Sequence, residues 1–71
     1  MNVIRKEVQM NTNVVMTNGR SYILSVKYDD LMKAIKNNLE NGIAFQDTET
    51  ILGVKVSLKI SEISEVVVAQ I

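Results

Sequence analysis

The segment VVMTNGRSYILSVKY, residues 14–28, carries the clearest structural signal in the chain, a predicted β-hairpin. Two runs rich in β-branched and aromatic residues, 14–17 and 21–26, flank the pair Asn18-Gly19. An Asn-Gly pair permits a positive φ at both central residues, which a tight two-residue hairpin loop requires. Apolar and polar side chains alternate in the second run, as expected of a strand with one buried face. The segment therefore predicts two antiparallel strands.

A single amphipathic helix is predicted to follow, in the segment DDLMKAIKNNLENG, residues 29–42. Leu31, Ile35 and Leu39 recur at the spacing i, i+4, i+8, which places them on one face of a helix. We expect Asp29 to cap the N-terminus, because its carboxylate accepts bonds from free backbone N–H groups. Gly42 is suited to the left-handed conformation that commonly ends a helix.

The remainder of the chain predicts three further strands. Residues 43–46 form the first, and residues 47–50 are expected to be a polar turn. Apolar and polar residues alternate over 52–60, which predicts a long strand with one apolar face. Residues 61–64 turn the chain into the final strand, EVVVAQI, residues 65–71.

The first ten residues fit either a strand or a helix, and we favour a strand or an extended arm that ends in a turn at 11–13. The predicted order is ββαβββ, with a possible extra N-terminal strand. Short links between strands favour antiparallel pairing. The sequence thus predicts one α+β domain over residues 1–71, a curved antiparallel sheet of about five strands with one helix. A small closed barrel is the alternative.

The composition excludes several chemistries. The chain has 71 residues, with eight Lys plus Arg, eight Asp plus Glu, no Cys and no His. Disulfides, thiolate metal sites and the usual zinc ligand and general base are therefore missing. We expect no enzyme activity, no cofactor and no metal. A net charge of zero gives no long-range attraction to nucleic acid or to anionic membranes.

Two features of the sequence concern its compartment. The N-terminal MNVIRKEVQM lacks the apolar core of a secretory signal peptide. The longest apolar run, residues 66–69, is far shorter than a membrane span. The sequence predicts a cytoplasmic protein without membrane association.

The final strand has apolar side chains on both faces, and one three-turn helix can cover only part of one face. A domain of this size buries only about 60% of its unfolded surface. We therefore expect a second copy of the chain to cover the remaining apolar surface, as a twofold dimer or a higher ring. The predicted interface residues are Val14, Met16, Val66, Val67, Val68 and Ile71.

Charged residues suggest two weaker hypotheses. A basic stripe on one strand could contact phosphates, and its candidates are Arg20, Lys27, Lys55 and Lys59. The pairs Asp29-Asp30 and Asp47/Glu49 could bind a cation or act as acid and base. A solvated sheet face, a helix N-terminus and a solvated hairpin loop explain the same residues without any ligand.

In its general composition, and in the segments TNGR and YDDLMKAIKNN and the β-rich tail, the chain resembles small uncharacterised proteins of low-GC Gram-positive bacteria and their prophages. The resemblance implies binding of a host protein, a nucleic acid or a signalling molecule. We expect a non-enzymatic, self-associating interaction or regulatory module that binds a protein partner, such as a phage-type inhibitor of a host protein. The alternatives are a small RNA- or DNA-binding protein and an oligomer that binds a small molecule between subunits.

Overall fold

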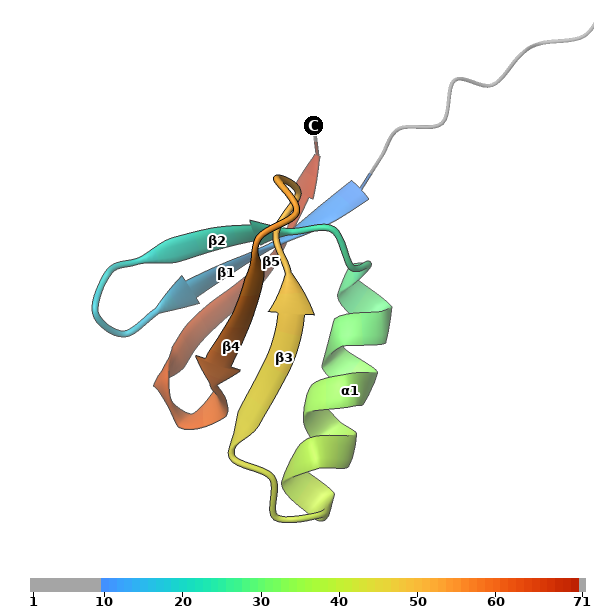
Figure 1. Ribbon diagram of the computed structural model, residues 1–71, viewed down its shortest axis with the longest axis vertical. Coiled ribbons are helices and arrows are strands. Elements are labelled where there is room, and N and C mark those ends of the chain that lie inside the picture. Colours follow the sequence, from blue (N-terminus) through green and yellow to red (C-terminus); the bar gives the residue numbers. More distant parts are fainter. Residues whose placement is uncertain (1–9, 71) are drawn as a thin grey trace, which may run out of the picture.

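A computed structural model describes residues 10–70, which form one helix and five strands in two antiparallel sheets (Figure 1). The predicted α+β class and the order ββαβββ are confirmed, whereas the sheet is not closed into a barrel. The elements are β1 (Met10–Met16), β2 (Ser21–Leu24), α1 (Tyr28–Glu40), β3 (Phe45–Glu49), β4 (Lys55–Lys59), the 3₁₀ turn η1 (Ile60–Glu62) and β5 (Ile63–Gln70). The possible extra N-terminal strand lies outside the described residues.

The strands divide into a three-stranded sheet, in the order β2-β1-β5, and a two-stranded sheet, β3-β4. The two sheets meet at an antiparallel bridge between Leu24 and Thr50. Next to this bridge, the Ser25 N–H donates to the Glu49 carbonyl (3.1 Å) and the Ile51 N–H donates to the Ile23 carbonyl (3.0 Å). This bridge and its two neighbouring bonds therefore join the β3–β4 hairpin to the end of β2, and the two sheets do not close into a barrel.

The β1–β2 hairpin is present, but its loop differs from the predicted two-residue turn. The Met16 N–H donates to the Arg20 carbonyl (2.7 Å), and the Gly19 N–H donates to the Met16 carbonyl (2.9 Å). Only Gly19 has a positive φ, 89°, and Asn18 does not. This pattern is a type I turn followed by a glycine bulge, the usual three-residue hairpin loop. The Asn18 side chain accepts a bond from the Arg20 N–H (2.9 Å), which stabilises the turn.

The β3–β4 hairpin has the same loop geometry, and the polar turn predicted at 47–50 is wrong. Asp47 and Glu49 belong to β3, while the loop contains Ile51, Leu52 and Gly53. The Gly53 N–H donates to the Thr50 carbonyl (2.9 Å), and the Thr50 N–H donates to the carbonyl of Val54 (2.8 Å). The Thr50 hydroxyl also accepts bonds from the N–H groups of residues 52 and 54. The turn therefore forms at Gly53, where the backbone can make these bonds, and not in the run of polar residues that precedes it.

Helix α1 begins two residues earlier than the predicted N-cap at Asp29 implies. Its N-cap is Lys27, which has an extended backbone and no side-chain capping bond, and its carbonyl accepts from the Leu31 N–H (2.9 Å). Asp29 and Asp30 lie in the first turn, so Asp29 is not the N-cap. Both carboxylates lie where the positive end of the helix dipole favours negative charge.

The C-terminus of α1 is the predicted left-handed cap. Gly42 has a φ of 73° and donates its N–H to the Leu39 carbonyl (3.2 Å). The Ile43 N–H reaches further back, to the Asn38 carbonyl (2.8 Å). These two bonds form a Schellman motif, which satisfies the last carbonyls of the helix and releases the chain toward β3.

We expect Gly42→Ala to lower the free energy of unfolding by about 1 kcal/mol, because a Cβ disfavours the left-handed conformation. A Cβ built at Gly42 meets no atom within 4 Å, so the cost is conformational and not steric. Urea unfolding followed by circular dichroism measures it. Gly42→Asn is the control and should cost less, since Asn tolerates this conformation better. Equal losses for Ala and Asn would contradict this explanation.

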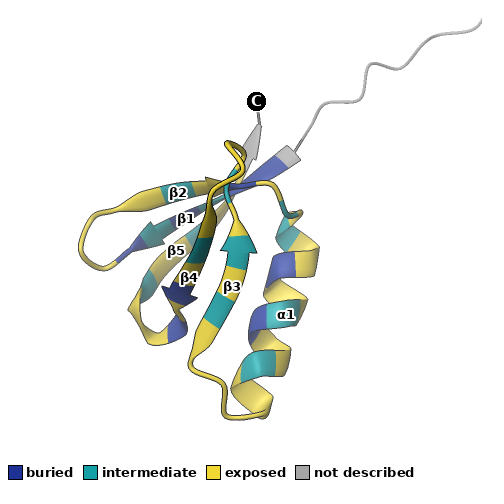
Figure 2. Cartoon of the chain, viewed as in Figure 1, coloured by how far each residue is buried: buried dark blue, intermediate teal, exposed yellow. Residues whose placement is uncertain are grey.

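The core lies between α1 and the inner faces of the two sheets, and Figure 2 shows buried positions on α1, β1 and β4. Its buried apolar side chains are Val14, Met16, Leu24, Leu31, Ile35, Leu58 and Ile60. Leu39, predicted on the buried face of the helix, is 58% exposed. Near that end of α1, the side chain of Asn38 donates to the Gln46 side chain (2.6 Å) on β3. A polar contact therefore replaces the expected apolar one.

The turn predicted at residues 11–13 is also wrong, because all three residues belong to β1. Thr12 is completely buried, and its hydroxyl donates to the Val26 carbonyl (2.7 Å). Residue 26 lies in the link between β2 and α1. Tertiary bonding thus compensates for the weak strand preference of the Asn-Thr-Asn sequence.

Candidate interaction surface

The pairing of β5 with β1 shows which side of the final strand is covered. Val66 lies opposite Val14, and Val68 lies opposite Thr12, so both share the core side of β1. Val66 packs partly buried against the core, whereas Val68 is 42% exposed. Val67 lies opposite Asn13 on the other side of the sheet and is also 42% exposed.

The six residues predicted at an interface are therefore not equivalent. Val14 is fully buried and Met16 is 9% exposed, so both belong to the core of the chain and not to its surface. Their apolar runs signal burial, and the sequence does not distinguish burial by α1 from burial by a partner. Val67 and Val68 remain at the surface, while Ile71 lies outside the described residues.

A row of residues crosses the outer face of the three-stranded sheet, away from α1. Asn13 of β1 pairs with Ile23 of β2 on one side and with Val67 of β5 on the other. Ile51 lies beside Ile23, since its N–H donates to the Ile23 carbonyl. We call Ile51, Ile23, Asn13 and Val67 the outer row. Its three apolar members are 43%, 39% and 42% exposed, respectively.

Residues beside the outer row carry little charge. Ser21 of β2 and Ser25, just beyond its end, flank Ile23, and Glu65 precedes Val67 by two residues on β5. Asn13 is partly buried, and its side-chain oxygen is the one buried side-chain polar atom among the described residues that lacks a hydrogen-bond partner. A second protein can cover such a row at low cost, because few charged groups lose their contact with water.

The loop of the β3–β4 hairpin extends this apolar surface. Leu52 is 85% exposed and Val54 is 55% exposed, and both flank Gly53 at the tip. Sequence reasoning assigned these residues to a strand, and it missed Ile23 by placing it on a polar face. Two signals in the sequence could have identified these residues. Gly53 favours a turn, and Ile23 must point to the opposite face of the strand from its neighbour Leu24.

A second set of exposed apolar side chains lies at the other end of β3, where α1 ends (Figure 1). Leu39, Ile43 and Phe45 are 58%, 47% and 50% exposed. Phe45 pairs with Lys59 across the β3–β4 hairpin. Apolar side chains are thus exposed at both ends of this hairpin.

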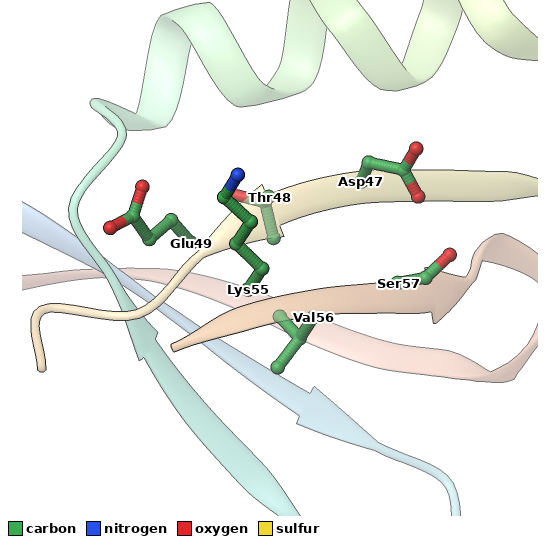
Figure 3. A pocket seen from close by; sticks show the side chains of 6 residues that line it. All are labelled: Asp47, Thr48, Glu49, Lys55, Val56 and Ser57. Carbon is green, nitrogen blue, oxygen red and sulfur yellow. The ribbon is translucent and has the colours of Figure 1, made fainter. Parts of the chain in front are cut away.

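The β3–β4 hairpin also lines an open groove of about 550 Å³ (Figure 3). Its lining residues are Asp47, Thr48, Glu49, Lys55, Val56 and Ser57. Glu49 pairs with Lys55 across the strands, and Asp47 pairs with Ser57. The lining thus has one cation, Lys55, and two carboxylates, Asp47 and Glu49, which gives the groove a slightly negative net charge. Within residues 10–70, no three His, Cys, Asp or Glu side chains are grouped to hold a metal ion.

The four cations predicted to contact phosphates do not gather on one surface. Arg20 lies in the β1–β2 loop and Lys27 lies at the start of α1, which are on opposite sides of the molecule in Figure 1. Lys55 and Lys59 lie on β4, with Asp47 and Glu49 on the adjacent strand. A phosphate backbone therefore meets no continuous basic track that includes all four side chains.

No protein-family model matches this chain, and comparison with curated proteins and with solved structures gave no significant match. In residues 10–70, no helix has the length and apolar character needed to cross a membrane.

Proposed function

We propose that this protein is a non-enzymatic, self-associating interaction module that binds a protein partner. The observation that carries the proposal is the outer row, in which Ile51, Ile23 and Val67 are aligned and each about two-fifths exposed. Apolar side chains grouped on the surface of a small soluble domain mark interaction sites, and Asn13, which separates Ile23 from Val67, is itself partly buried. The apolar tip at Leu52 and Val54 adjoins this row and enlarges the surface.

The size of the core supports the same proposal. In a chain of 71 residues, the buried apolar side chains of the described part number only seven. Domains of this size commonly depend on a disulfide, a metal or a partner subunit. Cysteine is absent from the sequence, and so is histidine. Self-association is the means of stabilisation that this composition leaves open.

We expect Val67→Glu to abolish self-association, because it introduces a charge at the β5 end of the outer row, where we expect a second copy to contact it. Desolvation of an unpaired carboxylate costs several kcal/mol, which corresponds to at least a hundredfold weaker association. Sedimentation velocity across a range of concentrations measures the mass. A folded parent and a folded variant that sediment alike as monomers would contradict the proposal.

Met32→Glu is the matched control for Val67→Glu. Met32 is 37% exposed, close to the 42% of Val67, but it lies on helix α1 and not on the outer face of the sheet. The control should sediment like the parent. If Met32→Glu also dissociates the assembly, the effect of Val67→Glu reflects added charge in general and not its position in the outer row.

The protein partner is identified by native mass spectrometry of assemblies isolated from the source cell, which reports subunit number and bound chains together. A nucleic-acid partner is the weaker candidate, since only Phe45 beside Lys59 offers an aromatic ring next to a cation on the β3–β4 hairpin. Affinity for an oligonucleotide that falls steeply with added salt would support that alternative.

A further inference from the structure

Strand β5 forms one boundary of the three-stranded sheet, and within residues 10–70 no strand pairs with its outer edge. Free edges invite pairing with another chain, and proteins protect them with charges, prolines or short strands. The opposite boundary of this sheet, β2, has only four residues, and the boundary strand β4 of the second sheet has five that include Lys55 and Lys59. By contrast, β5 has eight residues with Glu65 as its single charge, and the sequence contains no proline. The β5 edge is therefore less protected than β2 or β4.

Hydrogen bonding in the sheet shows which backbone groups point to this free edge. Met16 bonds across the hairpin toward β2, whereas the Thr17 N–H donates to the Glu62 carbonyl (2.8 Å) on the side of β5. Since bonding direction alternates along a strand, Asn13 and Val15 direct their backbone groups toward β5. Their partners on β5, Val67 and Glu65, point back toward β1. The groups of residues 66, 68 and 70 therefore point outward, whereas residue 64 lies where the register against β1 shifts, between the pairs Val15–Glu65 and Met16–Ile63.

We propose that β5 pairs antiparallel with β5 of a second copy, about a twofold axis at Val67, and forms one continuous sheet with three strands from each copy. This inference rests on the proposed function and names its self-association site. In this register Val66 of each copy lies opposite Val68 of the other. The outward backbone groups of one strand thus meet those of the other. Glu65 lies opposite residue 69, so like charges do not meet.

The register also explains the position of the apolar surface. Val67 faces its own counterpart as a non-hydrogen-bonded pair, the arrangement in which opposite side chains approach most closely. The outer rows of the two copies then join end to end through the two valines. The doubled row, with Ile23 and Ile51 on each side, remains open on one face of the sheet and is the surface offered to the protein partner.

Val67→Cys tests the register, because the natural chain has no cysteine and the new thiol is unique. Opposed residues in a non-hydrogen-bonded pair have Cα atoms about 4.5 Å apart, within the range that a disulfide spans. Mild oxidation should convert most of this variant to a covalent dimer on a non-reducing gel. Glu65→Cys should remain monomeric, since in this register the two copies of residue 65 are offset by four residues, about 13 Å. Ser57→Cys, on the other edge strand, is a second exposed control.

Amide exchange tests the backbone pairing without depending on a disulfide. The N–H groups of Val66 and Val68 should be protected in the dimer and lose that protection when the protein is diluted to monomer. The Val67 N–H, which points to β1, should be protected in both states. Rapid exchange at residues 66 and 68 in the dimer would overturn the inference.

The outcomes separate this inference from the proposed function. A parent protein that is monomeric at all concentrations contradicts both. A parent that self-associates, with Val67→Cys cross-linking no more than Ser57→Cys, leaves the proposed function standing and rejects pairing through β5.

Discussion

Leu24→Ala should lower the free energy of unfolding by about 2 to 5 kcal/mol, the usual cost of removing a leucine side chain from a packed core. Leu24 is completely buried, and it forms the bridge to Thr50 where the two sheets meet. Its side chain packs in the same core as Leu31 of α1 and Leu58 of β4. The substitution therefore leaves a cavity in the core where helix α1 and the two sheets meet.

The effect is large relative to the total stability available. At roughly 0.05 to 0.15 kcal/mol per residue, a domain of this length has a total free energy of unfolding of only several kcal/mol. We therefore expect a substantial unfolded fraction of Leu24→Ala at 25 °C. Urea unfolding followed by far-ultraviolet circular dichroism measures the difference from the parent.

Leu52→Ala is the matched control, because it makes the same chemical change at a side chain that is 85% exposed. Its effect on the free energy of unfolding should stay within about 0.5 kcal/mol. Losses of similar size at the two positions would mean that Leu52 is covered in the native protein, for example by a second copy. Repeating the measurement at several protein concentrations identifies that case, since a subunit contact makes stability depend on concentration.

Thr12→Val should cost about 1 to 3 kcal/mol, although the two side chains have nearly the same shape. The Thr12 hydroxyl is fully buried and donates to the Val26 carbonyl (2.7 Å). Valine offers no donor, so this carbonyl loses its bond and pays the cost of desolvation. The loss falls on the link between β2 and α1, and it should also loosen the start of the helix.

Thr17→Val is the control for the loss of a threonine hydroxyl. Thr17 is exposed and its hydroxyl donates to the Glu62 carboxylate (2.6 Å), where water can replace the lost donor. Its effect should stay within about 0.5 kcal/mol. Thermal unfolding separates the two cases, because 1 kcal/mol corresponds to about 4 to 8 °C in Tm for a domain of this size. A Tm for Thr12→Val equal to that of the parent would show that the buried bond contributes nothing.

Of the three apolar residues of the outer row, the sequence pattern predicts only Val67 at an interface. Val67 was identified because three consecutive valines cannot all face one side of a strand. Ile23 and Ile51 were not identified, since each contributes a single apolar side chain to a segment that reads as polar or as part of a strand. Val14 and Met16 were assigned to an interface, although α1 and β4 cover them. Residues that pair across strands are distant in sequence, so local patterns do not show which of them form a row.

The amino-acid sequence by itself determined the order of the elements, the face of α1 that begins at Leu31, and the end of that helix at Gly42. These features depend on contacts between residues a few positions apart, where periodicity and turn chemistry act directly. Only the tertiary structure decided that residues 11–13 join a strand, that the second hairpin turns at Gly53, and that no strand within residues 10–70 pairs with the outer edge of β5. Each depends on bonds between distant segments, such as Thr12 with Val26 or Asn13 with Val67. The energy of those bonds exceeds the weak local preferences of the residues concerned.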